Sequence, residues 1–151
     1  VVTVALAASP ISFCAVALFL AWDAEPQMQA HWAILGATAS AFGVLAALVV
    51  PGVITNAARR NLATVSADSP QERERERIDR LYGIYQIKHL TALALLEGAA
   101  LVAIVFFLLT TEFWLLAVAA VPIALMAVNF PWKDRVDLWV QEQAHLIEMR
   151  R

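Results

Sequence analysis

One acidic residue, Glu97, lies inside an otherwise uncharged apolar run from Leu90 to Leu109. At a helical rise of about 1.5 Å per residue, it lies about 10 Å from the start of that run. A carboxylate at this depth in a bilayer costs about 2–3 kcal/mol or more, so it marks a functional hypothesis. Burial favours the neutral acid, which can release and rebind a proton. The residue type and position therefore predict a proton or cation site.

A neutral carboxylic acid among apolar groups still needs a hydrogen-bonding partner. Pro51 has no N–H and leaves the carbonyl of Ala47 without its helical donor. We expect Glu97 to bond to this carbonyl, to a nearby hydroxyl group, or to a second copy of the chain. The candidate hydroxyl groups are those of Thr38, Ser40 and Thr91. The alternative is that Glu97 only fastens two helices together and binds no ion.

The histidines predict little further chemistry. His89 precedes Glu97 by eight residues and is a candidate for a water-linked proton relay, the alternative being an ordinary interfacial histidine. No two histidines form a ligand pair across a bundle, and Cys14 is the only cysteine, so we expect no metal, haem or other cofactor. The sequence contains none of the common catalytic or nucleotide-binding motifs, so we do not expect an enzyme. The motifs sought are a Ser-His-Asp set, a P-loop, an HExxH motif and a glycine-rich fingerprint.

Four apolar runs must position these residues. The chain has 151 residues, of which 61% are hydrophobic and 16% charged, far from the balance of a soluble domain. Each run is about as long as the ~20 residues that span a hydrocarbon core. We predict one all-α, integral membrane four-helix bundle over residues 1–151. Its spans are expected at about 1–22, 32–55, 90–109 and 113–130.

The positive charges predict the orientation of the bundle. All 11 Lys and Arg residues lie between the second and third runs or after the fourth. Basic residues stay on the cytoplasmic side of a membrane. We therefore expect a multi-pass protein of the plasma (inner) membrane, with both termini and the 57–88 loop in the cytoplasm. The net charge of −2 argues against a nucleic-acid partner.

Small residues predict where helices, or a second copy, approach closely, because lipid supplies no hydrophobic drive for association. The residues expected at these contacts are Gly36, Ala39, Gly43, Ala47, Gly98, Ala120 and Ala124. Pro51 and Pro122 are candidate hinges. An outer Trp and an inner Pro recur in the second and fourth runs, as in a duplicated two-helix hairpin, although chance accounts for the pattern equally well.

Two polar segments extend the bundle. Ser69, Pro70 and Glu72 form a helix-start signal with a capping box. No strong break follows, so residues 70–89 are expected to continue into the third span as one helix. Residues 133–151 have the pattern of an amphipathic helix, which either packs against the 70–89 segment or lies in the membrane interface.

Two functions follow from these observations. The first is an oligomeric subunit of a channel, transporter or sensor that uses Glu97 for a proton or cation. The second is a scaffold or accessory subunit of a larger membrane complex, which transports nothing and is organised through the helix that starts at Pro70. The expected partners are the lipid bilayer and either further copies of the chain or other subunits.

Overall fold

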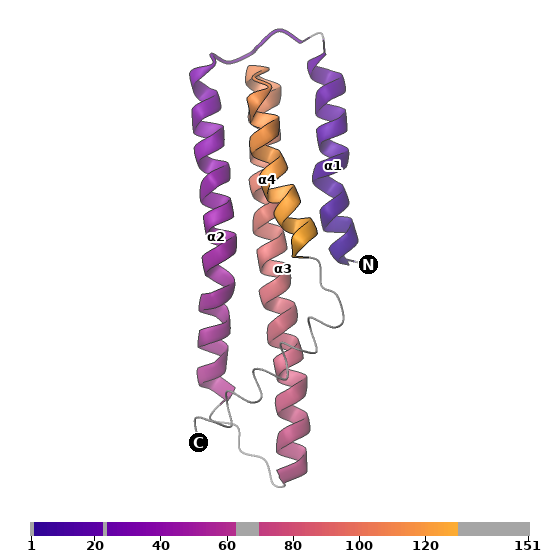
Figure 1. Ribbon diagram of the computed structural model, residues 1–151, viewed down its shortest axis with the longest axis vertical. Helices are drawn as coiled ribbons and strands as arrows, with labels where there is room; N and C mark the ends of the chain where they lie inside the picture. The colour runs from indigo at the N-terminus through magenta and orange to yellow at the C-terminus, as the bar shows by residue number, and fades with distance from the viewer. Residues whose placement is uncertain (1, 23, 63–69, 130–151) are drawn as a thin grey trace. The chain divides into compact units, whose positions relative to one another are not determined.

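The computed structural model describes residues 2–22, 24–62 and 70–129, and it is helical (Figure 1). The described residues form four helices, which confirms the predicted fold class at this level. Their bounds are α1 Val2–Ala21, α2 His31–Leu62, α3 Pro70–Thr110 and α4 Trp114–Val128. The predicted helix at 133–151 lies outside the described residues.

The chain divides into two compact units. The first contains Val1–Val49 and Thr91–Phe130, and the second contains Val50–Leu90 and Pro131–Arg151. Helices α2 and α3 each contribute one part to each unit. Glu97 and all of α1 and α4 therefore belong to the first unit, whereas His89 and Pro51 belong to the second.

Two of the helices are long and apolar enough to cross a membrane, over His31–Ala58 and Asp79–Thr110. Apolar stretches in α1 and α4, Ala8–Ala21 and Trp114–Val128, are shorter. The 15 residues of α4 extend only about 22 Å at helical rise, less than a hydrocarbon core of about 30 Å. Helix α2 continues past residue 55 to Leu62, because residues 56–62 contain neither proline nor glycine.

Proline positions agree with helix chemistry. Pro70 is the first residue of α3, where the missing N–H removes no helical bond, as predicted. Helix α3 then runs unbroken for 41 residues, so residues 70–89 and the apolar run form one helix. Pro10, Pro51 and Pro122 lie inside α1, α2 and α4, and each helix continues through its proline.

The end of α3 is closed by main-chain bonds. Thr111 has a positive φ of 55°, and its N–H donates to the Phe107 carbonyl at 2.7 Å, which is a helix-ending geometry. The N–H groups of Gln27 and Met28 both donate to the Leu109 carbonyl, at 3.0 and 2.9 Å. The connection between α1 and α2 is thereby tied to the end of α3.

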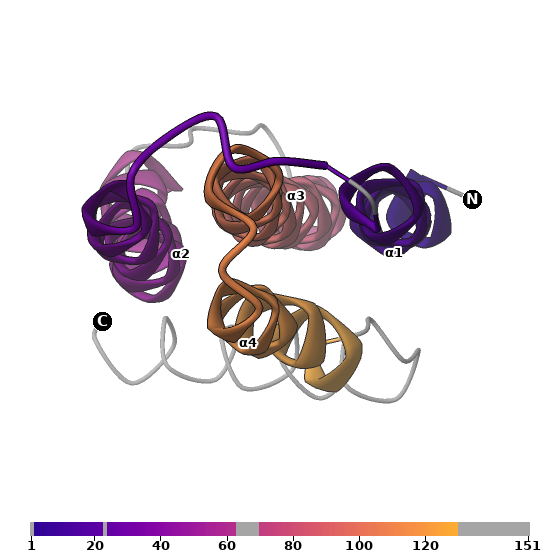
Figure 2. The same ribbon diagram turned by 90° about the horizontal axis from the view of Figure 1, so that it is seen from above.

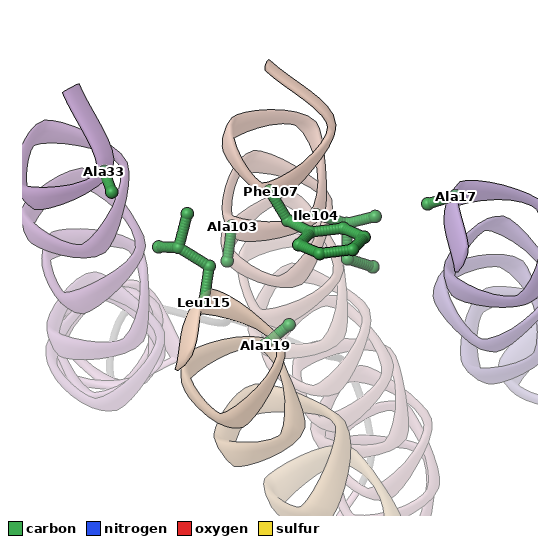
Figure 3. Close-up of a cluster of buried hydrophobic side chains, with 7 residues drawn as sticks. All are labelled: Ala17, Ala33, Ala103, Ile104, Phe107, Leu115 and Ala119. Atoms are coloured by element: carbon green, nitrogen blue, oxygen red, sulfur yellow. The ribbon is translucent and has the colours of Figure 1, made fainter. Parts of the chain in front are cut away.

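Helix α3 is the centre of the first unit, with α1, α2 and α4 around it (Figure 2). One apolar cluster joins all four helices, and Figure 3 shows its side chains converging. Its buried members are Ala17, Ala33, Ala103, Ile104, Phe107, Leu115 and Ala119. A second cluster joins Ala47 of α2, Leu93 and Leu96 of α3, and Met126 of α4. Alanine recurs in both clusters, so the helices meet at small residues.

Candidate functional site

Glu97 is half-buried on α3. On the same face of the helix, Leu93 is one turn before it and Ala100 nearly one turn after, and both are fully buried. Within residues 2–22, 24–62 and 70–129, no hydrogen bond or ion pair reaches its carboxylate. The site therefore begins with an acidic group beside a tightly packed apolar core, and the part of the chain that the structure describes offers this group no partner.

Helix contacts establish which way Glu97 points. A Cβ built on Gly43 of α2 would lie 2.8 Å from Ala99 Cβ, so Ala99 marks the side of α3 that meets α2. Each helical residue advances about 100°, which turns Glu97 about 160° away from Ala99 around the axis. Glu97 therefore points away from α2.

The predicted bonds from Glu97 to α2 are consequently wrong. The carbonyl of Ala47 and the side chains of Thr38 and Ser40 all belong to α2, on the opposite side of α3. The fourth candidate, Thr91, makes no hydrogen bond to Glu97 either in the part of the chain described.

Helix α1 lies on the side of α3 toward which Glu97 points. Ile104 and Phe107 of α3 extend toward Ala17 of α1 (Figure 3). In this unit α1 and α3 run in the same direction (Figure 1). Pro10 of α1 is fully buried.

Thr38 and Ser40, the other hydroxyl candidates on α2, have different environments. The Thr38 hydroxyl is exposed and donates to the Ile34 carbonyl at 2.7 Å. Ser40 is only 1% exposed, and its Oγ has no hydrogen-bond partner among the described residues. The structure brings neither of them to Glu97.

His89 lies in the second unit and is half-buried. Its ring stacks on that of Tyr85, with centroids 5.9 Å apart and planes inclined by 8°. Its Nε2 is buried and has no hydrogen-bond partner in the described part of the chain. The proposed relay from His89 to Glu97 remains a prediction.

Small residues of α2 line its contact with α3, but in a different register from the one expected. Ala39 is exposed. The residues of α2 that pack inward in the first unit follow a three-and-four spacing. They are the buried Ala33, Gly36, Ser40 and Ala47 and the half-buried Gly43. Gly36 admits the Phe106 ring, because a Cβ there would lie within 2.8 Å of Phe106 Cδ2. The spacing of small residues in the sequence could not decide whether Ala39 or Ser40 faces α3.

The small residues of α3 and α4 that were expected at helix contacts do not lie at contacts between the described helices. Gly98, Ala120 and Ala124 are exposed, and a Cβ on Gly98 would meet nothing within 4 Å. Helix α4 instead buries Leu115, Ala119, Pro122 and Met126. Both hinge candidates, Pro51 and Pro122, are buried.

Among the described residues, no group of three or more His, Cys, Asp or Glu side chains could hold a metal ion. A comparison of the chain with family models, curated proteins and solved structures finds no match.

Proposed function

We propose that this chain is an oligomeric membrane subunit in which Glu97 is the proton or cation site of a channel, transporter or sensor. The carrying observation is the half-buried Glu97 carboxyl group within an apolar helix, which has no hydrogen-bond or ion-pair partner among the described residues. A carboxylate with a purely structural role would be expected to have a hydrogen-bonding partner. An exchangeable ion requires a carboxyl group that can gain and lose its partner.

A bilayer around the helices is supported by the side chains that α2 exposes. Phe42, Leu48 and Ile34 are 69%, 64% and 65% exposed. Water would not favour so continuous an apolar face, whereas lipid would cover it. The distribution of Lys and Arg supports placing both termini in the cytoplasm.

An oligomer is supported by the small residues that remain exposed. Gly98 on α3 and Ala120 and Ala124 on α4 do not contribute to the core. Small side chains let membrane helices of different copies approach closely. These residues are therefore our candidates for contacts between copies.

Flux into proteoliposomes tests the proposal. The wild-type protein is reconstituted with a pH-sensitive dye inside, and proton or K⁺ and Na⁺ gradients are applied. We expect Glu97→Gln to lose at least about tenfold in flux, since an amide cannot release a proton. Glu112→Gln, which removes a carboxyl group from the turn after α3, is the matched control and should retain wild-type flux. Wild-type vesicles without flux, or an unchanged Glu97→Gln variant, would refute transport.

The scaffold function remains a second candidate because of the length of α3. Its 41 residues extend about 60 Å at helical rise, twice the thickness of a hydrocarbon core. A photo-crosslinking amino acid at the exposed Gln86 tests it in cells. Crosslinks to a different protein would support a scaffold, and crosslinks only to lipid or to further copies would count against it.

A further inference from the structure

We propose that Glu97 is reached from the cytoplasmic side through a water-filled entrance, which opens where α4 ends inside the membrane. A proton or a hydrated cation then reaches the carboxyl group through water. This inference rests on the proposed function, and it names the side of the membrane from which the site is filled.

Helix α4 is too short to cross a hydrocarbon core. It begins at Trp114, an exposed aromatic residue of the kind that anchors helices at a membrane interface. From there its 15 residues extend about 22 Å at helical rise. A hydrocarbon core is about 30 Å thick, so α4 ends about 8 Å before the cytoplasmic boundary.

The end of α4 carries polar groups that lipid cannot satisfy. An α-helix leaves its last carbonyl groups without helical donors. Asn129 closes the helix, because its N–H and its Nδ2 both donate to the Leu125 carbonyl, at 3.0 and 2.8 Å. The Asn129 side chain is exposed. Irregular backbone at membrane depth is tolerated only where protein buries it or where it lines a water-filled cavity. Since Asn129 is exposed and not buried, we infer that water solvates this end.

Packing within the first unit brings this end close to the depth of Glu97. Met126 of α4 packs in one buried cluster with Leu93 and Leu96 of α3. Asn129 lies three residues, or about 4.5 Å, further toward the cytoplasm. Glu97 directly follows Leu96, and helical side chains tilt toward the N-terminus, which on α3 is the cytoplasmic direction. The carboxyl group is therefore within about two helical turns of the level at which α4 ends.

Helix α2 provides a comparison at the same depth. The contacts of Gly43 with Ala99 and of Gly36 with Phe106 make α2 and α3 antiparallel, so equal steps along the two helices keep the same level. Five residues beyond Gly43, Leu48 lies at the level of the cluster just described. Its side chain is 64% exposed. Because α2 continues as a helix well beyond Leu48, lipid should cover this side chain and water should not reach it.

Single cysteines test the entrance. Glu97→Cys, Ala127→Cys and Leu48→Cys are each made in a Cys14→Ser background, on the full chain in proteoliposomes. A charged, membrane-impermeant methanethiosulfonate is added to one face of the vesicles at a time, and intact mass gives the rate. Such a reagent stays in water, so the rate reports water at the thiol.

We expect the cysteines at positions 97 and 127 to react from the cytoplasmic face at least about tenfold faster than the cysteine at position 48, because only the first two are in contact with the entrance. From the outer face all three should react slowly. The cysteine at position 127 leaves Glu97 intact, so it reports the entrance independently of the carboxyl group.

Asn129→Leu should slow the reaction at position 97 about fivefold, because an apolar side chain no longer stabilises water at the end of α4. Asn129→Gln keeps the amide and should retain the rate. Val128→Leu, which exchanges one apolar side chain for another on the neighbouring residue, is the matched control and should also retain it.

Three results would overturn the inference. The first is a reaction at positions 97 and 127 no faster than at position 48, and the second is a faster reaction at position 97 from the outer face. The third is an equal loss of rate in Asn129→Leu and Val128→Leu. Labelling needs no transport. An open entrance without flux would refute the proposed function alone, and flux without cytoplasmic labelling would refute the entrance alone.

Discussion

Ser40 is a buried polar residue at the contact between α2 and α3. Along the face of α2 that packs on α3, Ser40 lies between Gly36 and Gly43. Its hydroxyl group has no hydrogen-bond partner among the described residues. By contrast, the buried hydroxyls of Thr55 and Thr110 donate to the carbonyl four residues earlier, at 2.8 and 2.7 Å. A buried hydroxyl without a partner costs about 1–3 kcal/mol. Ser40 should therefore weaken the contact in which it lies.

Replacing Ser40 with Ala should leave the free energy of unfolding unchanged or raise it by about 1 kcal/mol, because only an unpaired hydroxyl is lost. The control is Thr110→Val, which removes a formed hydrogen bond and should lower that free energy by about 1 kcal/mol. Equilibrium unfolding in mixed micelles, followed by helical circular dichroism, measures both. A Ser40→Ala variant less stable than Thr110→Val would show that the hydroxyl has a partner in the assembled protein.

Glu97 illustrates how much of the site was predictable at the scale of one residue. A lone carboxyl group in an apolar run is visible in the sequence, because its cost in such surroundings is a local property. Its direction is not visible, since apolar residues flank it on every side of α3. The contact of Gly43 with Ala99 decides that direction and turns Glu97 away from the partners expected on α2.

At the scale of the helices, the α2–α3 contact depends on residues without bulk. Gly43 admits Ala99, and Gly36 admits Phe106. Gly98, on the same length of α3, has open space around it. These two kinds of glycine are indistinguishable in the sequence, yet substitutions at them should have opposite consequences.

Gly43→Ala should lower the free energy of unfolding by about 1–3 kcal/mol, because the new methyl group would overlap Ala99 and force α2 away from α3. Gly98→Ala is the matched control and should raise that free energy by about 0.5–1 kcal/mol, because alanine is the better helix former and its methyl group would meet open space. The same micelle titration compares them. Equal stabilities of the two variants would contradict the close contact described for α2 and α3.

At the scale of the whole molecule, charge rather than packing predicts the orientation. Every basic residue lies in two segments of the chain, whereas the 23–31 connection and the 110–112 turn carry only acidic charges and His31. A membrane protein with this distribution retains its basic segments in the cytoplasm. The prediction is independent of how the helices contact one another.

Single cysteines in a Cys14→Ser background test this orientation. We expect an impermeant maleimide to label cysteines at positions 77 and 150 from one face of the membrane, and those at positions 25 and 112 from the other. Right-side-out and inverted vesicles provide the two faces, and detergent-solubilised protein gives the maximum labelling. Labelling of positions 77 and 150 from opposite faces would overturn the predicted orientation.

Local properties of the chain determined its helices. Four helices and the unbroken α3 were predictable because the signals for them depend on neighbouring residues only. These signals are the apolar runs without breaks, the proline at the first helical position, and the absence of a strong helix break after Pro70. Tertiary structure alone decided which face each helix buries. Helices that are apolar all round have no preferred side by hydropathy, so the choice falls to side-chain volume. The faces that pack inward bury Ala119 rather than Ala120 and Ser40 rather than Ala39, and they turn Glu97 away from α2.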